Sequence, residues 1–316
     1  MTQRLAGSVA LVAGAARGAG RGIARMLGEA GATVYCTGRS ARGAPAVGTP
    51  HAGRAETVEE TAELVDDAGG TGVAVRVDHA APAAVAALAR HIEQERGRLD
   101  VVVNVLGGPQ VTDYRPFWKQ DVEQGWALVN AWVWPHVVTA RAVLPLMVRQ
   151  RSGLLVEIVE GEALAVQQQA YFDLAHTMLK RLAHSLAEEL APHGVTALAL
   201  APGFMRTEVV LDRLKATEAD WQQVAETSAE ARGFGFAGSE TPCFVGRAVA
   251  ALAADPAVRR WSGSVCSSWG LAAEYGFTDV DGRRPDWGRY LAEHFPALAL
   301  ATPQTGQRWA VTHAGS

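Results

Sequence analysis

Short apolar runs alternate along this chain with longer segments in which apolar residues recur at every third or fourth position. The short runs are typical of buried strands and cover residues 9–12, 33–37, 73–77, 101–105, 154–159, 195–200 and 263–267. The longer segments are typical of helices and cover residues 56–68, 82–96, 121–150, 171–190 and 242–253. This alternation predicts an α/β fold in which a doubly wound parallel sheet carries helices on both faces.

A glycine-rich turn follows the first apolar run and precedes a helical pattern at residues 23–27. It reads GAARGAG from Gly14 to Gly20. Glycines between a strand and a helix let a pyrophosphate approach bare backbone N–H groups, where the helix dipole favours an anion. The pattern predicts a single Rossmann-type domain with a dinucleotide bound at Gly14, Gly18 and Gly20. A tight turn without a ligand is the alternative.

Two arginines near this turn indicate the form of the cofactor. Arg39 stands at the end of the second strand, where a carboxylate would bind the ribose of NAD and an arginine suits the extra phosphate of NADP. With help from Arg17, the sequence favours NADP(H), although both arginines would also suit a solvated surface. Asp78 is expected at the adenine. Asn104 and Gly107 follow the fourth strand, at the edge where open parallel sheets bind ligands.

The composition is that of an ordinary globular protein. The 316 residues are 48% apolar and 20% charged with a net charge of -4, so a core can form unaided and no basic excess attracts nucleic acid. The three cysteines lie far apart, which argues against disulfides and structural zinc. Because no apolar leader and no long apolar span is evident, we expect a cytoplasmic protein without membrane or nucleic-acid partners.

Together these landmarks resemble the short-chain dehydrogenase/reductase (SDR) family over roughly residues 5–270. The glycine turn has the family's GxxxGxG spacing, Asp78 stands at its acidic position, and residues 104–107 stand where the family has Asn-Asn-Ala-Gly. Further matches are Asn130, Pro202, Gly203 and Thr207. The segment 276–282 is similar to one subgroup of the family.

The resemblance implies how the chain is divided. Residues 1–270 would form the SDR domain, with a substrate lid at about 204–240, and residues 271–316 would form a C-terminal extension. The family also implies a homodimer or homotetramer formed through the helices at 121–150 and 171–190. Among the matched residues, Pro202, Gly203 and Thr207 would lie over the nicotinamide and phosphates, while Asn130 would hold a water in a proton relay.

Three catalytic residues of the family are replaced in this chain. The family uses Ser after the fifth strand, then Tyr and Lys four residues apart on the next helix. Aligning residues 185–195 with the family's helix end places Phe172 at the tyrosine and His176 at the lysine. Glu160 falls at the serine, and its separation of twelve residues from Phe172 matches the family's spacing. The resemblance therefore implies a rewired catalytic centre.

Several nearby side chains are candidates for the lost acid. Tyr171 is one position early, which turns its phenol about 100° around the helix, so we expect it to be a poor substitute. His176 could transfer protons near neutral pH, with Glu160 or Asp173 orienting the imidazole. Alternatively, His176 only hydrogen-bonds the cofactor ribose in place of lysine. Both roles use the same location, and the sequence does not separate them.

Three functions are compatible with this pattern. The first is an NADP(H)-dependent reductase of a ketone, imine or iminium, acting on an apolar or aromatic small molecule because the expected lid contains Val209, Leu211 and Trp221. The second is a non-redox cyclase, isomerase or dehydratase that uses Glu160, Asp173 and His176 as acids and bases, with NADP(H) structural or absent. The third is a non-catalytic ligand-binding relative.

Overall fold

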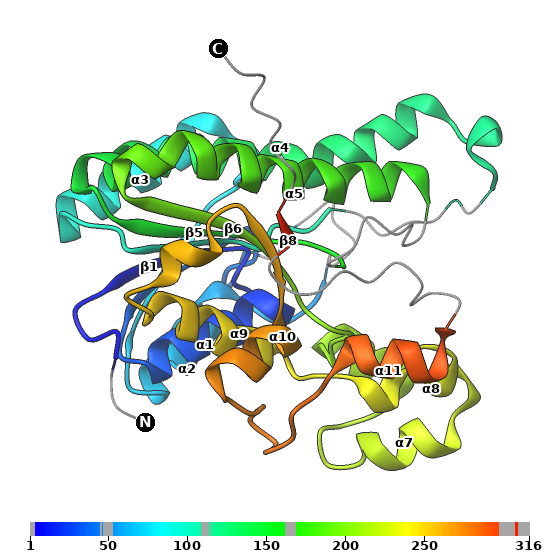
Figure 1. The fold of residues 1–316 in the computed structure, drawn as a ribbon. Helices are drawn as coiled ribbons and strands as arrows, with labels where there is room; N and C mark the ends of the chain where they lie inside the picture. The colour runs from blue at the N-terminus through cyan, green and yellow to red at the C-terminus, as the bar shows by residue number, and fades with distance from the viewer. Residues whose placement is uncertain are drawn as a thin grey trace.

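A parallel sheet forms the centre of the molecule (Figure 1). The computed structural model describes residues 4–44, 46, 53–108, 113, 115–161, 169–296 and 307–308. The parallel strands are β1 (Val9–Ala13), β2 (Thr33–Gly38), β3 (Thr71–Arg76), β4 (Val101–Asn104), β5 (Gly153–Ile158), β6 (Val195–Ala201) and β7 (Ser264–Ser267). Their order is β3-β2-β1-β4-β5-β6-β7, and β8 (Gln307–Arg308) pairs antiparallel with β7. The predicted doubly wound α/β fold is confirmed.

Helices cover both faces of the sheet (Figure 1). One face packs against α1 (Gly18–Glu29), α2 (Val58–Asp67) and α9 (Pro242–Ala253) in an apolar cluster that includes Ile23, Val65 and Val249. The other face packs against α3 (Pro82–Arg96), α4 (Val122–Gln150) and α5 (Ala170–Leu190), with Ile92, Met147 and Leu190 in a second cluster. The two clusters leave the carboxyl ends of the strands for polar residues and glycines, as expected for a ligand-binding edge.

The long helix α4 contains two prolines and still runs for 29 residues. Pro135 has no backbone N–H, so it cannot bond the carbonyl of Ala131 one turn earlier, and the hydroxyl of Thr139 donates to the carbonyl of Pro135 at 2.8 Å. By length and composition alone α4 could cross a membrane, a test that core helices of globular domains also pass. Here α4 packs on the sheet through Val143 and Met147, which are fully buried.

Residues 204–240 form a small helical lobe beside the sheet (Figure 1). The lobe contains α6 (Glu208–Leu214), α7 (Trp221–Thr227) and α8 (Ala229–Gly233) and has its own apolar cluster around Trp221 and Phe236. The C-terminal helix α11 (Trp287–His294) covers this lobe by stacking Trp287 on Phe204, with ring centroids 5.8 Å apart. The lobe occupies the segment that the family resemblance assigns to a substrate lid.

The predicted boundary at residue 270 is wrong in one respect. It falls inside α10 (Ser268–Tyr275), whose Leu271 and Ala272 are fully buried, and Leu271 belongs to the main core. The extension therefore begins after Tyr275. Its first segment braces the lobe, because Asp281 accepts a hydrogen bond from Arg206 at 3.0 Å and Arg283 donates to the carbonyl of Ser239 at 2.8 Å.

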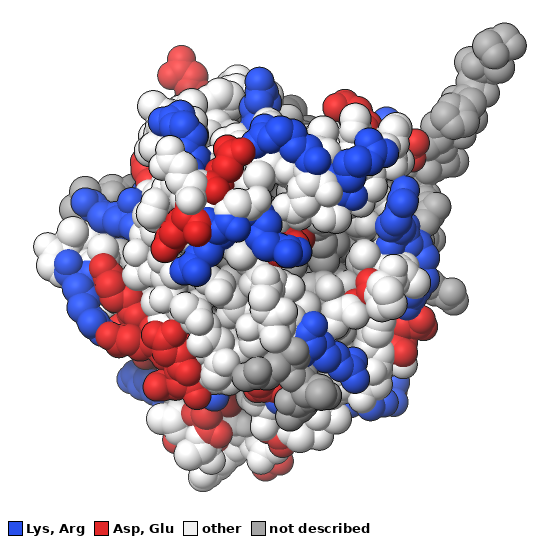
Figure 2. Space-filling model, turned by 90° about the vertical axis from the view of Figure 1, so that its left-hand side faces the viewer, with Lys and Arg blue, Asp and Glu red and all other residues white. Residues whose placement is uncertain are grey.

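The surface charge is mixed on the face shown in Figure 2, where Lys and Arg groups stand beside Asp and Glu groups. Across the described surface, exposed charges form ion pairs such as Arg42 with Glu63 at 2.6 Å and Arg213 with Glu230 at 2.9 Å. On the part of that face formed by described residues, no continuous basic surface of the kind that binds nucleic acid is visible.

Candidate active site

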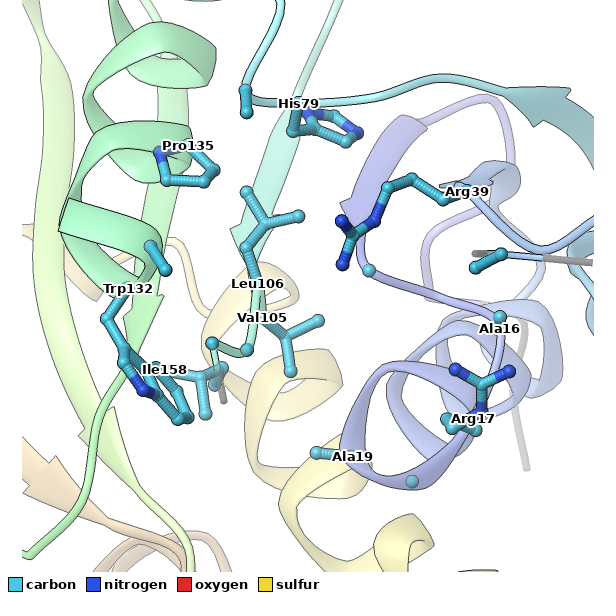
Figure 3. A pocket seen from close by; sticks show the side chains of 18 of the residues that line it. Ala16, Arg17, Ala19, Arg39, His79, Val105, Leu106, Trp132, Pro135 and Ile158 are labelled. Carbon is cyan, nitrogen blue, oxygen red and sulfur yellow. The ribbon is translucent and has the colours of Figure 1, made fainter. Parts of the chain in front are cut away.

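A cavity of about 930 Å³ lies at the carboxyl ends of the parallel strands (Figure 3). On the side of β1 to β3 it is lined by the predicted residues Gly14, Arg17, Gly18, Arg39 and Asp78. On the side of β4 to β6 it is lined by Gly107, Asn130, Glu160, His176, Pro202 and Thr207. The fold thus brings most of the predicted site residues to one cavity, large enough for a dinucleotide and a small substrate.

The glycine turn is held by close backbone contacts. Gly14 has a φ of 96°, and a Cβ at this residue would lie 2.4 Å from the carbonyl oxygen of Val105. A Cβ on Gly20 would lie 2.1 Å from the carbonyl oxygen of Gly14, so Gly20 shapes the turn from behind and does not line the cavity. Both positions require glycine for steric reasons, independently of any ligand.

A carboxylate already occupies the start of α1. The N–H of Gly18, the first residue of α1, donates to Oε2 of Glu208 at 2.9 Å. Neither a side-chain cap from Arg17 nor an acidic residue in the first turn is present within α1 itself. Glu208 therefore stands where a phosphate oxygen of a dinucleotide would accept the same hydrogen bond, which shows that this site accommodates an anion.

The two predicted phosphate ligands differ in their surroundings. Arg39 extends from the end of β2 into the cavity toward Leu106 and is exposed (Figure 3). Arg17 is more enclosed: it donates to the hydroxyl of Ser40 at 3.0 Å and pairs with Glu56 at 3.6 Å. Burial lowers the pKa of Arg17, and the neighbouring Glu56 opposes this shift. Arg39 is thus better placed than Arg17 to meet an added phosphate.

Asn104 does not contact the cavity, which corrects its predicted role as a cofactor ligand. Its side chain is fully buried and donates to Oε1 of Glu157 at 2.9 Å. Oε2 of the same carboxylate bonds Nδ1 of His136, which is also buried. Nε2 of His136 reaches the carbonyl oxygen of Leu106 at 3.0 Å. These three side chains fix the loop after β4 against α4, so Asn104 supports the wall of the cavity without lining the cavity itself.

His176 is buried at the cavity wall, with 2% of its surface exposed. Its Nδ1 accepts a hydrogen bond from the backbone N–H of Glu160 at 3.1 Å, so the ring proton of the neutral imidazole resides on Nε2. Nε2 has no hydrogen-bond partner among the described residues. Because His176 lines the cavity, this unpartnered buried donor is a candidate to bind an acceptor on a ligand that reaches the wall.

The protonation of His176 differs from the prediction. Desolvation, together with the charges of Lys180 and His136, lowers the pKa of His176 to about 3. This environment favours the neutral imidazole, which weighs against the expected proton transfer by a histidine that titrates near neutrality. The ring nitrogens do not contact the two predicted carboxylates: Nδ1 accepts from the backbone N–H of Glu160, and Nε2 has no partner within the described part of the chain.

Glu160 is the second titratable group of this wall. Its side chain is accessible from the cavity, yet the surrounding protein desolvates the carboxyl and raises its pKa, while the charge of Lys180 opposes the shift. The environment thus pushes the pKa values of Glu160 and His176 in opposite directions, which is typical of sites where one group holds a proton and its neighbour donates only a hydrogen bond.

Aromatic rings form the rest of this wall. The rings of Trp132 and Phe172 lie 4.7 and 4.4 Å from that of His176, measured between centroids. Trp132 also covers Gly108, where a Cβ would lie 2.5 Å from the indole. Asn130, one turn from Trp134 on α4, is exposed and lines the cavity. The wall therefore offers flat apolar surface next to a few polar groups.

Two of the predicted catalytic residues lie away from the cavity, and so does a third cofactor residue besides Gly20 and Asn104. The phenol ring of Tyr171 packs against α4, where a Cβ on Gly125 would lie 2.2 Å from it, and against Phe117 at 5.3 Å. Tyr171 and Asp173 do not line the cavity, so the helix rotation expected for Tyr171 is observed. Gly203 is buried, and its N–H donates to Glu240 at 3.0 Å.

Sequence reasoning missed several residues at this site. Lys180 is 4% exposed, and its charge acts on both Glu160 and His176. The spacing of Phe172, His176 and Lys180, four residues each, places them on one helix face and could have revealed the lysine. Glu157 is an acid inside an apolar strand, which was also a readable signal. For Glu208 no sequence signal exists, because its partner is 190 residues away.

Comparison with known proteins identifies the class to which this fold and cavity belong. The family model for short chain dehydrogenases matches residues 8–218. The chain therefore belongs to the short-chain dehydrogenase/reductase family, whose members are oxidoreductases that use nicotinamide cofactors.

Individual relatives extend this result. The chain is 33% identical over 288 residues to human dehydrogenase/reductase SDR family member 1, covering 90% of this chain and 86% of the relative. It is 32% identical to the 3-oxoacyl-(acyl-carrier-protein) reductase FabG of Pseudomonas aeruginosa, covering 65% and 76%. A short chain dehydrogenase structure from Mycobacterium thermoresistibile is similar in fold, with a TM-score of 0.69 at 19% identity, covering 90% and 92%. The predicted subgroup resemblance is confirmed.

Proposed function

We propose that this chain is an NADP(H)-dependent oxidoreductase that reduces the carbonyl or iminium group of an apolar or aromatic small molecule. The observation that carries the proposal is that His176 lines the cavity while its buried Nε2 donor has no partner among the described residues. The cofactor fits the remaining residues. Gly18 offers a backbone N–H that already binds a carboxylate, and Arg39 offers a cation for the added phosphate.

The chemistry divides between the cofactor and two side chains. When bound, the nicotinamide supplies a hydride. His176 donates a hydrogen bond from Nε2 to the substrate oxygen and stabilises the negative charge that develops there, without giving up its proton. Glu160, whose pKa is raised by desolvation, holds a proton that it transfers to the same oxygen. An iminium substrate needs no such proton, so its reduction depends much less on Glu160.

The rings of Trp132 and Phe172 support the substrate class. Both lie beside His176 and give the wall flat apolar surface, which favours an aromatic or aliphatic ring next to the reacting group. We further propose a homodimer or homotetramer through α4 and α5. Its support is an apolar groove of about 540 Å³ between these helices, lined by Val137, Leu144 and Leu186.

NADPH absorbance measured against a panel of aromatic ketones and cyclic iminium compounds tests the function. Glu160→Gln is expected to reduce kcat for ketones by about 100-fold and to leave iminium turnover within about threefold, since only the ketone needs a proton. His176→Phe, which removes the donor, should lower ketone turnover by about 100-fold. Asp173→Asn, away from the cavity, is the control. Turnover of a substrate with NADPH unchanged would contradict the proposal.

A non-redox function is the second candidate, and one observation favours it. Glu208 already fills the hydrogen-bonding position of the phosphate site. Glu160 could transfer a proton and His176 could donate a hydrogen bond to a substrate without a cofactor. An isomerase or dehydratase would give a product of equal mass, or of a mass lower by one water, with the cofactor unchanged. Mass spectrometry of the same reactions separates the two candidates.

A further inference from the structure

The contact between α6 and the glycine turn deepens the proposed function, on which it rests. We propose that Glu208 is a displaceable anion at the diphosphate position, so that binding of the cofactor releases α6 from α1. The N–H of Gly18 can donate its hydrogen bond to Oε2 of Glu208 or to a phosphate oxygen, but it cannot serve both well. A diphosphate would also face the like charge of this carboxylate.

The starts of the two helices are in direct contact. Thr207 is the N-cap of α6, with its hydroxyl accepting from the N–H of Val210 at 3.4 Å. Its Cγ2 would lie 3.4 Å from a Cβ on Gly18. Glu208 is the next residue. A phosphate that takes the Gly18 N–H therefore moves the carboxylate aside, and with it the first turn of α6.

A chain of ion pairs ties the same helix to the same turn from outside. Asp212, one turn after Glu208 on α6, pairs with Arg54 at 2.8 Å. Arg54 pairs with Glu56 at 2.5 Å, and Glu56 with Arg17 at 3.6 Å. The charge of Glu208 also acts on Arg17. The pair that joins this chain to α6 is Arg54 with Asp212, and the carboxylate of Asp212 is exposed, so this link is weak and Glu208 is the contact that closes α6 against the phosphate site.

The opposite side of the lobe is fixed, so the movement of α6 must occur between Arg206 and Glu208. Arg206 is 1% exposed and donates to the carbonyl of Ser239 at 2.9 Å and to Asp281 at 3.0 Å. Its guanidinium also stacks on Trp221, 4.0 Å from the ring centroid. Because Arg206 is anchored and Glu208 is displaceable, the movement is confined to the backbone around Thr207. Cofactor binding and opening of the substrate lobe then become one event.

Titration with ADP tests the proposal, because ADP has the diphosphate but neither the nicotinamide nor the added phosphate. Glu208→Gln removes the charge and Glu208→Ala removes the contact. Both are expected to lower the Kd for ADP, by about tenfold for Glu208→Ala, as measured by calorimetry. Glu226→Gln, an exposed glutamate on α7, makes the same charge change on the lobe and should leave the Kd unchanged. An ADP affinity equal to or weaker than wild type in both Glu208 variants overturns the inference, while the cofactor site itself stands.

Amide hydrogen exchange gives a readout without any ligand. In Glu208→Ala the amides of α6 should exchange at least about fivefold faster than in the wild type, and in Glu226→Gln they should not change. ADP added to the wild type should speed exchange in α6 while Gly18 stays protected. Unchanged protection of α6 in Glu208→Ala overturns the inference that Glu208 holds α6 against α1. Failure of every form to bind ADP overturns the proposed cofactor site as well.

Discussion

The two ends of the cavity are built by different means. At the nucleotide end, the shape of the site is set by the backbone. Gly14 and Gly20 leave no room for a Cβ, and the main-chain N–H of Gly18 binds the carboxylate of Glu208. At the catalytic end, the shape of the site is set by buried side chains. His176 is held by the backbone of Glu160 and flanked by aromatic rings. Backbone sites tolerate few substitutions, whereas side-chain sites can change one residue at a time, and we propose that the catalytic end of this chain has changed in this way at Glu160, Phe172 and His176.

The largest expected effect tests how the catalytic end is supported. His136→Ala should lower the free energy of unfolding by about 3–5 kcal/mol, because it removes the partner of Oε2 in the buried pair with Glu157. Urea denaturation measures this change. The control is Arg149→Ala on the same helix, whose ion pair with Glu93 is exposed and should contribute less than about 1 kcal/mol. Equal costs for the two variants would contradict a special role for the buried pair.

The next effect tests the nucleotide end. Gly14→Ala should weaken binding of NADPH by at least about 100-fold, since the new Cβ would meet the carbonyl of Val105 and the backbone has a positive φ. Fluorescence titration gives the Kd. Gly97→Ala is the matched control, because Gly97 has a φ of 68° with nothing within 4 Å of the added Cβ. Gly97→Ala should cost stability only, and a similar loss of affinity there would refute the steric argument.

A third effect concerns Glu240, which supports the loop after β6. Burial raises the pKa of Glu240 to about 8, with hydrogen bonds from Ser268 and Gly203 opposing the shift. The folded state therefore binds a proton that the unfolded state releases above about pH 4.5, so stability is lost as pH rises toward 8. Between pH 6 and pH 9 the loss is about 2–3 kcal/mol.

Glu240→Gln should remove this slope, and thermal unfolding followed from pH 6 to pH 9 measures it. Glu218→Gln is the control, since its half-exposed carboxylate pairs with Arg206 at 3.2 Å in the same lobe. If the wild type and Glu240→Gln lose stability in parallel over this range, the carboxyl of Glu240 is ionised in the folded protein and the argument fails.

The smallest effect tests the choice of cofactor. Arg39→Gln should raise the Kd for NADPH about tenfold, or about 1.4 kcal/mol, and leave the Kd for NADH unchanged. Arg17→Gln should change both affinities less selectively, because Arg17 is already engaged by Ser40 and Glu56. Equal losses of affinity for NADPH and NADH in Arg39→Gln would show that this arginine does not bind the added phosphate.

The sequence predicted the nucleotide end better than the catalytic end, and the reason is physical. The glycine turn is a local feature in which strand, turn and helix are contiguous, so spacing alone locates Gly14 and Gly18. The position of His176 followed from alignment along one helix, and that of Glu160 from its place after the fifth strand. The protonation of His176 did not, because it depends on burial and on the charges of Lys180 and His136. Asn104 was misassigned for a similar reason: its partner Glu157 comes from a neighbouring strand.

The anchoring of Arg206 also sets an order of events during synthesis. Its buried guanidinium needs Asp281, which is made 75 residues later, and the ring of Phe204 needs Trp287. While the chain is still growing, the lobe that contains Arg206 has emerged without the carboxylate and aromatic ring that complete it. The parallel sheet can assemble through β6 before that point. The substrate lobe must therefore dock last, and a ribosome pausing before residue 281 would hold a nucleotide-binding core whose substrate side is unfinished.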